Sequence, residues 1–101
     1  MIKYVLSIGL NDKDTKKQEI ETGKAWDKII ETLQNNAIEG ATVYEARGIY
    51  KLEAENTARV EVLDFEGDTY NKIVSAIKVL KKELNQECIA LETIETNSVL
   101  L

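Results

Sequence analysis

The feature that most constrains this chain is a stretch near its middle, residues 41–65, with the sequence ATVYEARGIYKLEAENTARVEVLDF. Two runs in it, Ala41–Leu52 and Ala58–Phe65, are rich in the β-branched and aromatic residues that favour strands. The polar segment Glu53–Thr57 separates them. This pattern predicts a β-hairpin whose turn is Glu53–Thr57.

The segments on either side of the hairpin predict one strand and one helix each. Residues 2–10 alternate as a strand does, and Cys88–Glu95 is the last predicted strand. Apolar residues at helical spacing predict helices from an N-cap at Thr22 to about Asn36 and from an N-cap at Asp68 to Asn85. Residues 96–101 form either a short edge strand or a tail. The buried helix faces should carry Trp26, Ile29, Ile30, Leu33 and Ala37 in the first helix, and Ile73, Ala76, Ile77, Leu80 and Leu84 in the second.

The predicted order of elements is β-α-β-β-α-β, which is the ferredoxin-like arrangement of the α+β class. With right-handed crossovers, strands 1 and 3 lie in the middle of a four-stranded antiparallel sheet, and strands 2 and 4 lie at its edges. Both helices cover one face of this sheet. At 101 residues the chain is expected to form a single domain over residues 1–101.

Composition excludes several classes of function. The net charge of −5 argues against nucleic acid and anionic membranes as partners, since both require a basic surface. The chain has no histidine, so it contains no imidazole base, no Ser-His-Asp triad and no histidine-bound metal. Cys88 is the only cysteine, and no apolar run is long enough to span a membrane. We therefore expect a cytoplasmic protein without a cofactor.

The sheet face opposite the helices predicts a homo-oligomer. Aromatic residues such as Tyr44 and Tyr50 fall on that face, and no helix is left to cover it. An exposed apolar patch of this kind usually marks an interface.

The topology also brings three connections to one end of the sheet: the polar loop Asn11–Glu21, the hairpin tip at Leu52–Thr57, and the turn Asn85–Glu87. The first helix begins there, and its free N–H groups with the nearby lysines favour a small anionic ligand. The candidate ligand-binding residues are Asn11, Asp12, Lys13, Asp14, Gln18, Glu19, Arg47, Tyr50, Gln86 and Glu87.

Some side chains allow a second interpretation. Asp12, Asp14 and Glu19 could bind a hard cation such as Mg²⁺ through oxygen, but they equally fit a solvated acidic loop, and we assign no metal. Cys88 is expected to be an inert core thiol rather than a nucleophile. Trp26 is expected to lie in the core rather than against a ligand.

Two resemblances are present. Gly40–Gly48, with the sequence GATVYEARG, and the strand Arg59–Val62 resemble PII-type signalling proteins, although the hairpin loop here is far shorter than theirs. That resemblance implies trimers of ferredoxin-like subunits that bind adenine nucleotides and 2-oxoglutarate between subunits. Most of the chain also resembles a group of small bacterial and phage ferredoxin-like proteins of unknown function. The matching segments are Tyr4–Asp14, Gln18-Glu19, Gly40–Tyr50 and Asn85–Glu87.

Three functions agree with these observations. The first is an oligomeric binding module for a small anionic metabolite or nucleotide, regulatory or sequestering rather than catalytic. The second is a structural or protein-interaction module, which in a phage could act on a host defence protein. The third is a small ferredoxin-like enzyme, whose chemistry would depend on carboxylates, tyrosines, lysines or Cys88.

Overall fold

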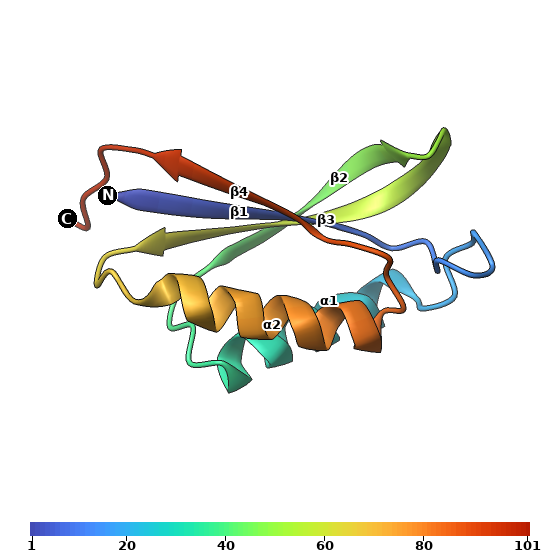
Figure 1. Cartoon of the computed structure of the whole chain (residues 1–101), viewed down its shortest axis with the longest axis horizontal. Coiled ribbons are helices and arrows are strands. Elements are labelled where there is room, and N and C mark those ends of the chain that lie inside the picture. The colour runs from blue at the N-terminus through green and yellow to red at the C-terminus, as the bar shows by residue number, and fades with distance from the viewer.

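A four-stranded antiparallel sheet carries two helices on one of its faces (Figure 1). The computed structural model describes residues 1–101. The strand order is β2-β3-β1-β4, so β1 and β3 are central, as predicted. The ferredoxin-like α+β fold is thereby confirmed. The elements are β1 (Ile2–Gly9), α1 (Thr22–Asn35), β2 (Thr42–Tyr50), β3 (Glu53–Asp64), α2 (Thr69–Glu83) and β4 (Ala90–Glu95).

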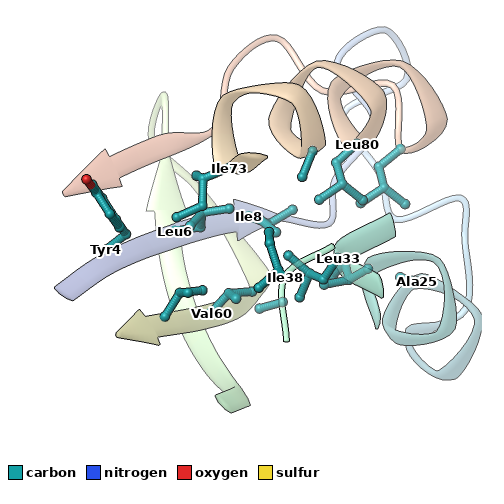
Figure 2. Packing of buried hydrophobic residues seen from close by; sticks show 14 of the residues in the cluster. Tyr4, Leu6, Ile8, Ala25, Leu33, Ile38, Val60, Ile73 and Leu80 are labelled. Atoms are coloured by element: carbon teal, nitrogen blue, oxygen red, sulfur yellow. The ribbon is translucent and has the colours of Figure 1, made fainter. Parts of the chain in front are cut away.

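The core lies between the sheet and the helices, because alternation sends every second strand residue toward them (Figure 2). Leu6 and Ile8 of β1 and Val60 of β3 are fully buried there. They pack in one cluster with Ile29 of α1 and Leu80 of α2. Each such side chain contributes about 1.5–3 kcal/mol to folding.

The buried face of α1 is rotated slightly from the predicted one. Ala25, Ile29 and Leu33 form it, whereas Ile30 is 42% exposed and Ala37 lies beyond the helix with a positive φ of 58°. The apolar pattern of this helix allows two rotations of the helix about its axis, and contact with the sheet selects one of them. In α2 the predicted face is correct, although Ile77 is only half-buried.

The predicted helix caps were partly wrong. Glu21, rather than Thr22, occupies the N-cap position of α1, and its side chain makes no capping hydrogen bond. Thr22 is the first helical residue, and its hydroxyl accepts a hydrogen bond from Gln18 at 2.9 Å. Asp68 does occupy the N-cap position of α2, also without a side-chain capping bond. At the other end, Asn85 has a positive φ of 47°, as is common for asparagine just after a helix.

The hairpin turn is not where the sequence placed it. β3 begins at Glu53, so residues 53–57 are strand rather than turn, and Lys51 and Leu52 alone connect the strands. Both turn residues have positive φ, 49° and 71°. This is the geometry of a tight type I′ turn, which usually carries Asn and Gly. Lys51 and Leu52 carry no such signal, so the turn could not be located from the sequence.

At the C-terminal side, β4 begins at Ala90, two residues later than predicted, and residues 96–101 form no further strand. The backbone N–H of Thr96 still donates to the carbonyl of Met1, at 2.9 Å. No helix is both long enough and apolar enough to cross a membrane.

Candidate functional site

A cavity of about 620 Å³ opens on the sheet face that the helices do not cover. Its floor is made of small side chains on the strands: Ser7, Gly9, Ala46, Gly48, Thr57 and Ala90. Its walls come from the hairpin tip, the loop after β1 and the turn after α2. These three segments lie at the same end of the molecule (Figure 1). The predicted meeting of these three connections is confirmed.

The turn after α2 ties the loop after β1 to the sheet. The Asn85 side-chain amide donates to the carboxylates of Asp12 and Asp14, both at 2.9 Å. The Gln86 amide donates to the carbonyl of Asn11 at 2.7 Å. The bond from Asn85, with backbone N–H groups of the loop, holds the pKa of Asp12 below its ordinary value. The loop is therefore ordered by contacts with residues more than seventy positions away.

Glu87, the next residue, binds the hairpin tip. Its carboxylate accepts a hydrogen bond from the Tyr50 hydroxyl at 2.9 Å and pairs with Lys51 at 2.8 Å. Lys51, and then Tyr50, lower the pKa of Glu87. The Cys88 thiol also contacts the Tyr50 hydroxyl, at 3.5 Å, and this contact together with Glu87 raises the pKa of Tyr50. Cys88 is exposed, so the expectation of a buried core thiol was wrong.

Glu55 of β3 also lines the cavity, beside the small residues of its floor. Its carboxylate covers Gly9, where an added Cβ would come within 2.1 Å of the Oε1 atom. The backbone N–H of Asn11 donates to its Oε2 at 3.1 Å. Gly9 thus admits a close approach, as its place in a strand suggests, but the group that approaches is a carboxylate.

The open face around the cavity is more polar than expected. The Arg59 guanidinium donates to the Ser7 hydroxyl at 2.6 Å and to Glu92 at 3.3 Å. The Tyr44 hydroxyl donates to Glu61. Tyr44 and Tyr50 are exposed on this face, as predicted, but their hydroxyls take part in a network of hydrogen bonds and ion pairs with charged residues.

Seven of the ten predicted site residues line the cavity, namely Asn11, Asp12, Lys13, Arg47, Tyr50, Gln86 and Glu87. Asp14, Gln18 and Glu19 lie outside it. Gln18 instead bonds Asn56 at 2.7 Å and Thr22, so it supports the loop that leads to α1. Glu55 and Arg59 also line the cavity but were not predicted, because their place in it depends on how β3 pairs with its neighbours. The only sequence signal near them was Gly9, which predicted the close approach of another group.

The charges that line the cavity nearly cancel, although the chain as a whole carries −5. Five basic and four acidic side chains contribute, namely Lys13, Lys16, Arg47, Lys51 and Arg59 against Asp12, Glu53, Glu55 and Glu87. A polyphosphate favours a clearly positive site, whereas a neutral or zwitterionic ligand suits this balance.

The start of α1 opens into a different cavity, of about 390 Å³, on the helix side of the sheet. Thr22, Trp26 and Arg47 line it. The free N–H groups of the helix therefore do not point into the larger cavity, contrary to the expectation for an anion site there. Trp26 is half-buried, and its indole Nε1 is buried without a hydrogen-bond partner.

The acidic side chains of the loop after β1 do not gather into a group of metal ligands. The carboxylates of Asp12 and Asp14 are held by Asn85, while Glu19 is exposed. No group of three or more acidic or sulfur side chains is placed to hold a metal ion.

Comparison with known proteins shows likeness at the level of the fold. No family model and no curated protein matches this chain. A phage S-adenosylmethionine (SAM) lyase in complex with S-methyl-5′-thioadenosine has a TM-score of 0.73 and 22% identity, over 93% of this chain and 80% of that one. A DUF3240 family protein from Shewanella baltica has a TM-score of 0.64 and 13% identity, over 99% and 97% of the two chains. CutA1 from Pyrococcus horikoshii has a TM-score of 0.57 and 21% identity, over 99% and 87%. The expected resemblance to small bacterial and phage ferredoxin-like proteins is supported at this level.

Proposed function

We propose that this chain is a small binding module for a nucleoside or a nucleotide of low charge, with the open-face cavity as its site. The observation that carries the proposal is the cavity itself. Its volume of about 620 Å³ falls in the range of small-molecule sites, roughly 300–1,000 Å³. Small side chains on its floor, such as those of Ser7, Ala46 and Ala90, suit a flat ring. The phage SAM lyase of similar fold, in complex with a thioadenosine nucleoside, supports this ligand class.

The charged groups around the cavity favour binding over catalysis. Glu87 is engaged by Lys51 and Tyr50, and Arg59 is engaged by Ser7 and Glu92. Groups that are paired in this way keep a fixed shape around a ligand, which suits a binding role. We therefore propose a regulatory or sequestering role.

Isothermal titration calorimetry with S-methyl-5′-thioadenosine, adenosine, AMP and ATP tests the proposal. Ala46→Leu places a large side chain on the cavity floor and should abolish binding. Ala54→Leu is the matched control, because Ala54 is exposed on the other face of the same hairpin and does not line the cavity. Binding by the wild type and the control, but not by Ala46→Leu, supports the site. Failure of the wild type to bind any of the four ligands overturns the proposal.

Catalysis on SAM is the second candidate, and the likeness to the phage SAM lyase favours it. Tyr50, Glu87 and Cys88 meet on the cavity wall and would be the nearest reactive groups. Incubation with SAM followed by chromatography separates the two functions. Formation of S-methyl-5′-thioadenosine by the wild type, but not by Ala46→Leu, identifies an enzyme. Unchanged SAM supports the binding module instead.

A further inference from the structure

The Glu55 carboxylate is held in place by one of its two oxygens, while the other is free. Oε2 accepts the backbone N–H of Asn11 at 3.1 Å, and Oε1 has no hydrogen-bond partner within the chain. No lysine or arginine forms an ion pair with it, whereas Glu87 and Glu92 on the same face are both paired. Glu55 is half-buried and lines the cavity.

The backbone on both sides of Glu55 carries no side chain. Its register partner on β2 is Gly48, and its carboxylate lies directly on Gly9 of β1. Gly9 brings no side chain to this contact, whereas the Thr57 hydroxyl occupies the space above Gly48. Glu55 lines the cavity, so a ligand held there would meet this carboxylate.

A fixed carboxylate with a free oxygen is an acceptor, so it selects a donor on the ligand. A carboxylate can accept from both hydroxyls of a ribose, and acidic residues bind the ribose 2′-hydroxyl in dinucleotide sites. We propose that Glu55 binds the ribose hydroxyls of the nucleoside and thereby selects ribonucleosides over deoxyribonucleosides. This inference rests on the proposed function.

The experiment compares adenosine with 2′-deoxyadenosine and 3′-deoxyadenosine by calorimetry. A hydrogen bond to a charged acceptor is worth about 1.5–3 kcal/mol, so the wild type should bind adenosine about tenfold or more tightly than either deoxy analogue. Glu55→Gln keeps the size of the side chain but removes the charge. The ratio of the affinities for adenosine and for each deoxy analogue should then fall toward one. Glu45→Gln is the matched control, because Glu45 lies on the other face of the hairpin, and it should keep the preference.

A second variant protects the test against a folding defect in Glu55→Gln. The new Cβ of Gly9→Ala would collide with the Glu55 carboxylate and push it aside, whereas Gly40→Ala meets nothing within 4 Å. The first variant should lose the preference, and the second should keep it. Equal binding of adenosine and its deoxy analogues by the wild type overturns the role of Glu55 and leaves the binding module intact. The absence of all nucleoside binding overturns the proposed function, and this role with it.

Discussion

At the scale of single residues, Asp64 shows how a buried carboxylate is accommodated in a small domain. It ends β3 and is 9% exposed. Its Oδ1 accepts the backbone N–H of Gly67 at 2.7 Å and the hydroxyl of Thr69 at 2.8 Å. Burial raises the pKa of Asp64, but the bonds from Thr69 and Gly67 outweigh it and lower the pKa below its ordinary value of 3.8. Asp64 thus orders the start of α2, a role expected of Asp68.

This gives a prediction about pH. A carboxylate whose pKa is lower in the folded state stabilises the protein above its unfolded pKa, and that stability is lost as the pH falls through the folded value. Asp64→Asn should lower the free energy of unfolding by about 1–2 kcal/mol at neutral pH, because hydrogen bonds to a charged acceptor are stronger than those to an amide. As the pH falls below 3.8 and through the lowered pKa of Asp64, the stabilities of the two proteins should converge.

Urea denaturation at several pH values measures this difference. Asp68→Asn is the control, since Asp68 makes only an exposed ion pair with Lys72, at 3.5 Å, and its loss should matter little. If the difference in free energy of unfolding between wild type and Asp64→Asn stays constant from neutral to acid pH, the stabilising role of the Asp64 carboxylate is contradicted.

At the scale of elements, the hairpin turn carries unfavourable backbone geometry. Lys51 and Leu52 both have positive φ, and Leu52 is 96% exposed. The left-handed conformation costs roughly 1–2 kcal/mol for a residue with a side chain. Lys51 recovers part of this cost through its ion pair with Glu87. Leu52 has no contact that would do so.

Leu52→Gly should therefore stabilise the protein by about 1 kcal/mol, because glycine adopts positive φ without steric cost. Thermal unfolding followed by circular dichroism should show a midpoint about 4–8 °C higher. Leu52→Ala keeps the unfavourable φ and should leave the midpoint unchanged. A lower midpoint for Leu52→Gly would mean that the leucine side chain packs against another molecule.

At the scale of the whole molecule, exposed apolar side chains lie at both ends of its long axis, and the sheet has two open edges. Leu52 and Ile49 are exposed at the hairpin, and Val99 and Leu100, 71% and 77% exposed, lie near the opposite end (Figure 1). The outer edges of β2 and β4 have no neighbouring strand. Edges of this kind readily pair with another chain. We propose that the protein is a homo-oligomer that uses these edges rather than the polar centre of the open face.

Native mass spectrometry of protein purified gently from cells tests this proposal. We expect a symmetric oligomer, with the mass of a nucleoside retained on each subunit. Replacement of Val99 and Leu100 by serine should shift the distribution toward monomers, because it removes apolar surface from the interface. A wild-type monomer at micromolar concentration contradicts the proposal, whatever ligand it carries.

The sequence by itself determined the order of the elements, the strand order of the sheet and the end at which the three connections meet. Each of these follows from local patterns: alternation in residues 2–10, helical spacing in two segments, and the handedness of the crossovers. Asn85 ended its helix as predicted, because asparagine tolerates a positive φ. Seven of the ten candidate residues therefore fell on the cavity.

Only the tertiary structure decided the phase of α1, the position of the hairpin turn and the role of Glu55. The turn residues Lys51 and Leu52 lack any local signal for positive φ, and the pairing of β2 with β3 imposes it. Glu55 contacts Gly9 because β1 pairs with β3 in one register, across 46 positions of sequence. Such a contact depends on residues distant in the chain, so a local sequence pattern cannot contain it.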